Sequence, residues 1–311
     1  MKIVSYDNYI NKQTRKKNWL ALGNFDGVHK AHEKILRDAV KWSEKYNFTP
    51  GVLLFDPHPE VYFNGKKDFL LTSFDEKIEK IRKCGIKLAI TKSFGSEFAS
   101  KPPYEFVKWT IQKLNAVGVS IGYDFTFGKK KLGRADDMIA FGRALGFFTS
   151  TVPPVKTPDG IPVSSSLCRE LLKKGKPEKA MEYLSEPYSI TGKVIKGDGR
   201  GRKLGFPTAN ISPPLYKLLP KRGVYLVKVK KDDQMYWGIC NIGKRPTFDK
   251  RMDNIEIHLL DFNGSIYDQH LRLYFISYIR PEISFTSSAE LVHQMEQDLN
   301  FARNKILKTL H

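Results

Sequence analysis

The sequence predicts an α/β half followed by an all-β half, and three patterns in its 311 residues support this. Short apolar segments alternate with helix-like segments up to about residue 152. Beyond residue 187 apolar and polar residues alternate with a period of two, and residues 288–310 return to a helical period. The chain should therefore hold a parallel sheet covered by helices, then a small antiparallel barrel or sandwich with a terminal helix.

The first half contains five apolar runs that we expect as strands: residues 18–22, 51–55, 86–91, 117–122 and 147–152. Between them lie segments such as 33–46, in which apolar residues recur at helical spacing. Ser73 and Glu76 form a capping-box pattern that should open a helix running to Lys83. Strand and helix in alternation indicate a parallel sheet with helical crossovers.

A proline-rich segment at 153–162 interrupts this pattern, and two short helices are expected after it, at 167–174 and 178–184. We place the domain boundary near Pro187, which gives domains 1–186 and 187–311. The strands expected in the second domain are 190–196, 223–230, 236–242, 255–261 and 271–279.

The side chains that should face the interior of the second domain follow from its period of two: Tyr225, Val227, Val229, Ile255, Ile257 and Leu259. The terminal helix has one apolar face, made of Leu291, Met295, Leu299, Ala302 and Ile306. A helix with such a face is expected to pack on the strands before it.

Lysine and arginine outnumber aspartate and glutamate by 52 to 33, a formal net charge of +19. This charge favours anionic partners such as nucleotides, nucleic acid or acidic lipids. A solvated basic surface explains it equally well, because the basic residues are spread along the chain. Residues 1–17 lack the pattern of a signal peptide and no apolar run is long enough to span a bilayer, so we expect a cytoplasmic protein.

The three cysteines, Cys84, Cys168 and Cys240, are far apart in the sequence and odd in number. This spacing fits neither a disulfide framework nor closely spaced zinc ligands. We expect free, partly buried thiols.

The most informative segment of the first half is residues 23–32, GNFDGVHKAH, which follows the first predicted strand and opens the first helix. A loop at such a junction points backbone N–H groups and the positive helix end toward a phosphate site. Gly23 and Gly27 allow close approach of the backbone, and His29 and His32 share a face of the first helical turn. Two histidines at this spacing, with no other motif around them, would more often be chance or half of a metal site. The glycine-containing loop between a strand and a helix favours phosphate binding instead.

At this segment the chain resembles the nucleotidyltransferases with a His-x-Gly-His motif, and most closely the bacterial bifunctional riboflavin kinase/FAD synthetase family. Other segments agree: FDPHP at 55–59, GYDFTFG at 122–128 and VSSSLCR at 163–169. The resemblance covers nearly the whole chain. It implies a Rossmann-like nucleotidyltransferase fold for the first half, in which an FMN phosphate oxygen attacks the α-phosphorus of ATP and pyrophosphate leaves.

The resemblance implies that His29 and His32 stabilise the transferred phosphoryl group and that His58 and Asp124 contact the flavin. The residues implied for ATP binding are Gly23, Asn24, Phe25, Asp26, Gly27, Ser164, Ser165, Ser166 and Arg169. Taken alone, the serines would serve equally as helix caps.

Four positions of the first half, in three motifs, depart from the family pattern. Ala31 stands for the usual glycine of the histidine motif, Ser166 and Cys168 replace threonine and isoleucine, and Thr126 replaces an arginine. A methyl group at Ala31 could weaken the binding of the nucleotide. We expect an active but slower adenylyltransferase.

The second half opens on residues 197–210, GDGRGRKLGFPTAN, a glycine-rich and basic segment suited to phosphate, although it is not a Walker loop. Thr208 and Asn210, two apart on an extended chain, face the same side and can share a cation. The segment matches the riboflavin kinase signature. The resemblance implies that Thr208 and Asn210 bind Mg²⁺ and that they contact ATP together with Gly197, Lys203 and Gly205.

Glu256 lies between Ile255 and Ile257 on the opposite face of its strand. The resemblance makes it the general base that takes the proton of the riboflavin 5′-hydroxyl. On spacing alone, an exposed strand glutamate would explain it as well. The companion segments NIGKRPT at 241–247 and RPE at 280–282 favour the catalytic interpretation, while Asp268 replaces a common glycine in a turn.

The predicted protein thus phosphorylates riboflavin to FMN and adenylylates FMN to FAD, with Mg²⁺, with ATP as co-substrate, and with riboflavin, FMN and FAD as substrates or products. One alternative is a riboflavin kinase with weak or lost adenylyltransferase activity that serves as an RNA-binding flavin regulator. A nucleotidyltransferase for another phosphorylated metabolite would not explain the second half. Neither membrane nor nucleic acid is expected as a partner, and the sequence leaves the oligomeric state open.

Overall fold

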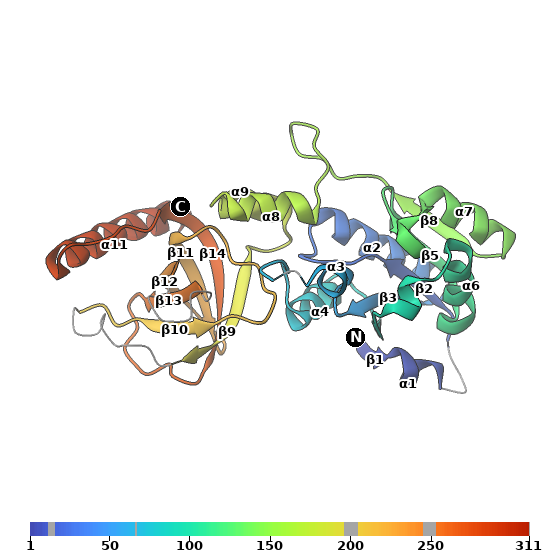
Figure 1. The fold of residues 1–311 in the computed structure, drawn as a ribbon, viewed down its shortest axis with the longest axis horizontal. Helices are drawn as coiled ribbons and strands as arrows, with labels where there is room; N and C mark the ends of the chain where they lie inside the picture. Colours follow the sequence, from blue (N-terminus) through green and yellow to red (C-terminus); the bar gives the residue numbers. More distant parts are fainter. Residues whose placement is uncertain (12–15, 66, 196–204, 245–252, 311) are drawn as a thin grey trace. The chain divides into compact units, whose positions relative to one another are not determined.

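The computed structural model describes residues 1–11, 16–65, 67–195, 205–244 and 253–310 (Figure 1). The chain divides into two compact units: unit 1 is Met1–Lys67 with Ser73–Ser165, and unit 2 is Asp68–Thr72 with Ser166–His311. The functional domains expected from the sequence, 1–186 and 187–311, stay a prediction.

Unit 1 is built on a six-stranded sheet in the order β1-β4-β3-β2-β5-β8, in which every neighbouring pair is parallel. The strands are β1 (Lys2–Ser5), β2 (Asn18–Leu22), β3 (Thr49–Asp56), β4 (Leu88–Ser93), β5 (Ala116–Gly122) and β8 (Phe148–Val152). The five strands expected from the apolar runs are confirmed, and β1 is an additional edge strand.

The helices of unit 1 are α1 (Tyr6–Ile10), α2 (Lys30–Lys45), α3 (Pro59–Asn64), α4 (Phe74–Lys83), α5 (Ser96–Ala99), α6 (Pro103–Leu114) and α7 (Ala135–Ala144). A short hairpin of β6 (Thr126–Phe127) and β7 (Gly133–Arg134) encloses the 3₁₀ turn η1 (Lys129–Lys131). The capping box of α4 is confirmed, because Ser73 Oγ accepts from Glu76 N at 3.3 Å and Glu76 Oε2 accepts from Ser73 N at 2.9 Å.

Two hydrophobic clusters cover the two faces of this sheet. On β2, Leu20 and Leu22 join the cluster that includes residues of α6 and α7, while Trp19 and Ala21 join the cluster that includes residues of α2 and α4. Successive strand residues point to opposite faces, so the alternation places helices on both sides. This is the double cover that a parallel sheet needs.

The order of the strands creates a switch point between β2 and β5. From β2 the chain continues to β3 and β4 on one side of the sheet, whereas β5 and β8 lie on the other. In open parallel sheets, ligands bind beyond the carboxyl ends of the strands at such a point. The loops after β2 and β5, residues 23–29 and 123–125, therefore border the expected binding region of unit 1.

Unit 2 is a closed antiparallel barrel in the order β10-β13-β12-β11-β14-β9. The strands are β9 (Ser189–Ile195), β10 (Ala209–Ser212), β11 (Gly223–Lys231), β12 (Gln234–Lys244), β13 (Asp253–Leu259) and β14 (His270–Arg280). All six residues expected to face the interior are buried in one hydrophobic cluster, which confirms the predicted inward face. Val224 and Leu226 are buried as well, so β11 departs from strict alternation.

Three helices and one distant segment pack with this barrel. The helices are α8 (Ser165–Lys173), α9 (Pro177–Tyr183) and α11 (Ser288–Leu310). Cys168 and Leu172 of α8 and Ala180 of α9 belong to the cluster of the barrel. The segment Asp68–Thr72 joins unit 2 through backbone hydrogen bonds between residues 69–70 and 216 and between residues 218 and 70.

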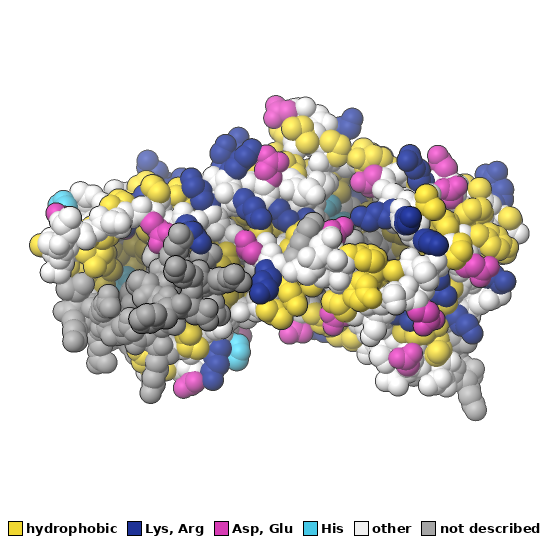
Figure 2. Space-filling view, in the orientation of Figure 1, with side chains coloured by type: hydrophobic (Ala, Val, Ile, Leu, Met, Phe, Trp, Pro, Cys, Tyr) yellow, Lys and Arg dark blue, Asp and Glu magenta, His cyan; other side chains and the backbone are white. Residues whose placement is uncertain are grey.

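The surface and the cysteines agree with the sequence. On the face shown in Figure 2, Lys and Arg side chains are scattered over both units. Cys84, Cys168 and Cys240 are buried, and none of the three forms a disulfide in the described part of the chain. Within the described ranges, no helix is both long and apolar enough to cross a bilayer.

Candidate active sites

The loop that joins β2 to α2 has an unusual backbone. Phe25, Gly27 and Val28 have φ values of 49°, 83° and 45°, all in the left-handed region. Phe25 and Val28 are fully buried, and a Cβ atom on Gly23 would lie 3.1 Å from Cζ of the Phe25 ring. A side chain at Gly23 would crowd this ring, and the side chain of Phe25 anchors the loop in the core. Any contact of Phe25 with a nucleotide has to come from its backbone.

His29 and His32 stand together at the start of α2. His29 is the N-cap residue, and its Nδ1 accepts from His32 N at 3.3 Å. The two imidazole rings stack with centroids 3.6 Å apart, and the Phe25 ring meets His32 edge-on at 5.2 Å. Because Nδ1 of His29 is an acceptor, a proton on the neutral ring belongs on Nε2. The structure thus brings together the two histidines expected from the sequence.

Asn24 and Asp26 are part of this loop, and Ser165 contacts it. Asn24 is exposed, whereas Asp26 is buried. Ser165 Oγ donates to the carbonyl oxygen of Asp26 at 2.8 Å. Ser164 is half-buried and belongs to unit 1 with Ser165, while Ser166 is exposed and belongs to unit 2.

Arg169 of α8 is held within unit 2 by the segment Asp68–Thr72. Its Nε donates to the Phe69 carbonyl at 2.9 Å, and its guanidinium carbon lies 3.9 Å from the centroid of the Phe69 ring. These contacts fix the orientation of a side chain that was expected to contact ATP.

The two residues expected to contact the flavin follow β3 and β5. His58 is buried and caps α3, because its Nδ1 accepts from Glu60 N at 3.1 Å. Asp124 is exposed in the loop after β5. Both follow the carboxyl ends of parallel strands, the edge where ligands bind.

An aromatic cluster beside His58 was not expected from the sequence. Tyr62 and Phe63 of α3 are 41% and 61% exposed, and their rings meet Phe94 edge-on at 5.6 and 5.5 Å. Phe94 follows β4, and its ring also meets that of Phe55 at the end of β3. The adjacent Tyr-Phe pair three residues after the FDPHP segment was a usable signal, because exposed paired aromatics mark binding surfaces.

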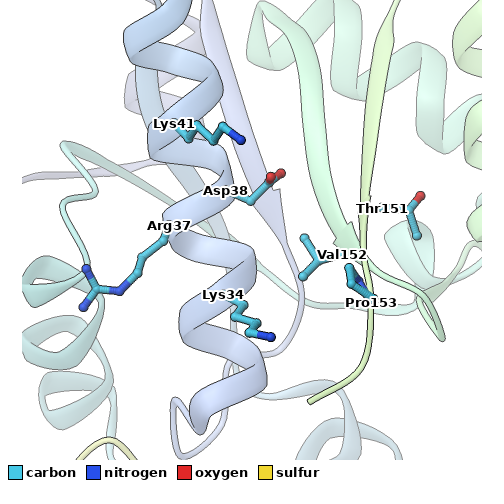
Figure 3. Close-up of a pocket in the computed structure, with 7 residues that line it drawn as sticks. All are labelled: Lys34, Arg37, Asp38, Lys41, Thr151, Val152 and Pro153. Carbon is cyan, nitrogen blue, oxygen red and sulfur yellow. The ribbon is translucent and has the colours of Figure 1, made fainter. Parts of the chain in front are cut away.

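A pocket of about 320 Å³ lies between α2 and the end of β8 (Figure 3). Its lining residues are Lys34, Arg37, Asp38, Lys41, Thr151, Val152 and Pro153. Ser120 Oγ donates to Asp38 Oδ2 at 2.5 Å, and Tyr123 N donates to the Val152 carbonyl at 3.2 Å. The pocket includes none of the residues expected from the sequence, and three of the residues that line it are basic.

In unit 2, three polar residues align across neighbouring strands. Glu256 of β13 pairs with Asn210 of β10 on one side and with Asn241 of β12 on the other. Directly opposite residues point to the same face of a sheet. Ile255 and Ile257 are buried in the core, so this face is the outer one, as expected for Glu256.

The carboxylate of Glu256 has a neighbour on its own strand. Asn254 Nδ2 donates to Glu256 Oε1 at 2.7 Å. Residues two apart on a strand share a face, so the amide orients the carboxylate from the same side. Sequence reasoning missed Asn254, although a spacing of two from Glu256 was the available signal.

Asn210 has the features of a cation ligand. Its side chain is buried, and among the described residues Oδ1 has no hydrogen-bond partner. Thr208 is half-buried two residues earlier, just before β10. Hydroxyl and amide oxygens are ligands that Mg²⁺ accepts. The two residues fit the ion that the sequence implied.

Glu282 and Gly243 lie close together beside the same strands. A Cβ atom on Gly243 would overlap the Glu282 carboxylate and would lie 3.3 Å from Asn241 Nδ2. A side chain at this position would displace the exposed Glu282 carboxylate. The NIG and RPE segments of the sequence therefore meet next to Asn241.

Two expected ATP contacts, Gly197 and Lys203, lie outside the described residues. Gly205 is described; it is exposed and has a φ of 84°, in the region that favours glycine.

Comparison with known proteins identifies the relatives of this chain. A family described as FAD synthetase matches residues 11–167, and one described as riboflavin kinase matches residues 184–306. The solved structure of a protein from Streptococcus pneumoniae, described as a macrolide-efflux protein, superposes with a TM-score of 0.88 at 30% identity, over 97% of this chain and 99% of that one.

Several curated relatives share one name. The bifunctional riboflavin kinase/FMN adenylyltransferase of Bacillus subtilis is 36% identical over 95% of this chain and 94% of its own length. The protein of that name from Listeria monocytogenes is 35% identical over 90% of this chain and 89% of its own length. The one from Escherichia coli K12 is 31% identical over 97% of this chain and 97% of its own length. The chain belongs to the bifunctional riboflavin kinase/FMN adenylyltransferase family.

Proposed function

We propose that unit 2 phosphorylates riboflavin with Glu256 as the general base. The observation that carries this proposal is the row of Asn210, Glu256 and Asn241 on the outer face of three neighbouring strands, with Asn254 bound to the carboxylate. Glu256 takes the proton of the riboflavin 5′-hydroxyl as its oxygen attacks the γ-phosphorus of ATP. The bond from the γ-phosphorus to the bridging oxygen breaks, and ADP leaves.

Asn210 and Thr208 would hold Mg²⁺ in this unit. The buried Oδ1 of Asn210, which has no hydrogen-bond partner in the described part of the chain, supports this assignment. When bound, the ion would supply positive charge against the ATP phosphates. Gly205, together with Gly197 and Lys203, is assigned to ATP.

Unit 1 transfers AMP from ATP to FMN in this proposal. An FMN phosphate oxygen attacks the α-phosphorus, the bond to the β-phosphate breaks, and pyrophosphate leaves. Both reactants are anions, so the protein has to position them and offset their charge. The stacked His29 and His32 at the positive end of α2 support a role as donors to the phosphate oxygens.

The flavin of FMN would lie against the aromatic cluster beside His58. Tyr62 and Phe63 offer exposed rings next to the ends of β3 and β4, and a flat isoalloxazine ring stacks on such surfaces. Asp124, exposed after β5, is assigned to the same flavin.

The first test replaces the carboxylate of Glu256. Glu256→Gln keeps the shape of the side chain but removes the base, and loss of a general base costs roughly 10²- to 10⁴-fold in rate. We expect FMN formation from riboflavin to fall at least about 100-fold, while FAD formation from supplied FMN is unchanged. Separation of riboflavin, FMN and FAD by chromatography measures both activities.

The matched control is Glu296→Gln, an exposed glutamate on α11 that should leave both activities as in the wild type. Near-normal FMN formation by Glu256→Gln would remove the carboxylate from the mechanism.

We also propose that the partners are small molecules and that both reactions take place in the cytoplasm. Filter binding of structured RNA at moderate salt tests the alternative of an RNA-binding regulator, because electrostatic RNA binding weakens steeply with salt. Retention that persists at moderate salt would favour the regulator.

A further inference from the structure

The loop between β2 and α2 must be held in shape from outside. Phe25 and Val28 are not glycine, and each residue of this kind loses roughly 1–2 kcal/mol in the left-handed region. Val28 is also β-branched, which makes this region still less favourable. Such conformations persist only where the surroundings over-determine them. The contacts of the loop should therefore include groups that stabilise it.

Two side chains from distant parts of unit 1 bind the carbonyl groups of this loop. Lys77 Nζ, from α4, donates to the carbonyl oxygen of Asn24 at 3.1 Å. Ser165 Oγ donates to the carbonyl oxygen of Asp26 at 2.8 Å. Between them, Val28 N donates to the Phe25 carbonyl at 3.3 Å. Three consecutive carbonyl groups are thus each bound by a donor.

This arrangement suits a loop that has to receive a triphosphate. A carbonyl oxygen carries partial negative charge and repels phosphate, whereas backbone N–H groups attract it. Donors that bind the carbonyl groups fix the peptide orientations and offset this negative charge. The Lys77 side chain, which supplies one of these donors, is only 6% exposed, and limited exposure strengthens its electrostatic interaction with the carbonyl group.

We infer that Lys77 is a positioning residue for adenylyl transfer and that it acts with Ser165 by holding the loop in its ATP-receiving conformation. The inference rests on the proposed function of unit 1. It gives Ser165, expected from the sequence to contact ATP, a contact with the loop instead. It adds Lys77, which comes from a helix that carries none of the residues assigned to the reaction.

The test replaces Lys77 with Met, which keeps the length of the stem and removes the donor and the charge. Loss of a hydrogen bond from a charged donor commonly costs tenfold or more in binding. We expect the KM for ATP in FAD formation to rise about tenfold or more, with a smaller change in kcat. The KM for ATP in FMN formation, measured on the same polypeptide, should stay at the wild-type value.

Two variants separate the loop contact from general effects on α4. Lys77→Arg keeps a charged donor and should restore the KM for ATP to within about threefold of wild type. Lys83→Met removes an exposed lysine of the same helix, which pairs with Glu79 at 3.2 Å, and should change neither activity. Rescue by arginine distinguishes a positioning role from a space-filling one.

A double variant tests whether Lys77 and Ser165 act through the same loop. Ser165→Ala should raise the KM for ATP by about threefold to tenfold, the effect of one lost neutral hydrogen bond. If both hold one conformation, Lys77→Met with Ser165→Ala should raise it by less than the product of the single effects.

The outcomes separate the inference from the proposed function. A wild-type protein that forms no FAD would refute the function of unit 1. A wild-type protein that forms FAD, with Lys77→Met at the same KM for ATP, would overturn the inference alone. If Lys77→Met leaves unit 1 unfolded, as judged by the fluorescence of Trp19, Trp42 and Trp109 in a Trp237→Phe background, an unchanged KM in Ser165→Ala overturns it.

Discussion

Ala31 is the second residue of α2 and lies between His29 and His32 in the sequence, at the position where the family motif has glycine. Its methyl group is half-buried. If a nucleotide packs against this turn, removing the methyl group brings the backbone closer to it. We expect Ala31→Gly to lower the KM for ATP in FAD formation about threefold and to destabilise unit 1 by roughly 0.5–1 kcal/mol, the cost of glycine in a helix. Steady-state kinetics and urea unfolding measure the two effects.

Ala140→Gly, at an exposed position of α7, is the matched control for the helical cost of glycine. It should lower stability by a similar amount and leave the KM for ATP as it is. An Ala31→Gly variant with an unchanged or higher KM would show that the methyl group is compatible with the nucleotide.

The residue types of the sites could be predicted from sequence better than their contacts. The pair His29 and His32 was expected from spacing, because three residues make about one helical turn. That the side chain of Phe25 is fully buried depends on a left-handed φ, which no pattern of residue types specifies. At Asp268, in contrast, the family's common glycine was a usable sign of the backbone conformation, because the φ of this residue is 63°. Asp268 also forms an ion pair with Lys193 at 2.9 Å.

At the scale of elements, strands with apolar runs were predicted well and exposed or short ones were not. β1 has exposed residues at Lys2 and Ile3 and lies at an edge of the sheet, so it lacks the apolar run of a central strand. β10 has only four residues and follows a proline-containing segment. Such strands form because a neighbour offers unpaired backbone groups, and this information lies elsewhere in the chain.

A buried ion pair links helix α11 to the barrel. Arg280 Nε donates to Asp298 Oδ1 at 2.8 Å and Nη2 donates to Oδ2 at 2.7 Å. The two side chains are only 16% and 5% exposed. Removing one partner of such a pair leaves a buried charge without compensation.

We therefore expect Asp298→Ala to destabilise unit 2 by about 3–5 kcal/mol, more than the pair itself contributes. Thermal inactivation of FMN formation should occur at a lower temperature, while inactivation of FAD formation from supplied FMN should not move. Replacing both Arg280 and Asp298 with Met should recover much of the loss, because no unpaired charge remains. Equal inactivation temperatures for Asp298→Ala and wild type would contradict the anchoring role.

At the scale of the whole molecule, buried thiol and phenol groups make the stability of the fold depend on pH in the alkaline range. Burial raises the pKa of the Cys84 thiol to about 11; Glu33 adds to the rise, while Arg37 and Lys80 oppose it. Burial also raises the pKa of Cys240, with a contribution from the charge of Glu256, and that of Tyr225, to which Tyr278 contributes. Both units therefore contain groups that the folded state keeps neutral.

The direction of the effect follows from linkage. The Cys84 thiol has a higher pKa in the folded state than in the unfolded chain. Its contribution to stability is fully present below the pKa of the unfolded chain, near 9, and is lost as the pH rises through the pKa of the folded state. For Cys84 the loss between pH 8 and pH 10.5 amounts to about 2 kcal/mol. Lysines also lose charge in this range, so the thiol has to be isolated by comparing variants.

Unit 1 can be followed separately, because Trp19, Trp42 and Trp109 lie in it and Trp237 is the only other tryptophan. In a Trp237→Phe background, tryptophan fluorescence during urea unfolding reports on unit 1. Cys84→Ala should lose about 2 kcal/mol less stability than its parent between pH 8 and pH 10.5. Ser43→Ala, a buried position of α2 that does not titrate, should keep the parent's pH dependence. Parallel curves for Cys84→Ala and the parent would mean that the thiol ionises as readily in the folded protein as in the unfolded chain.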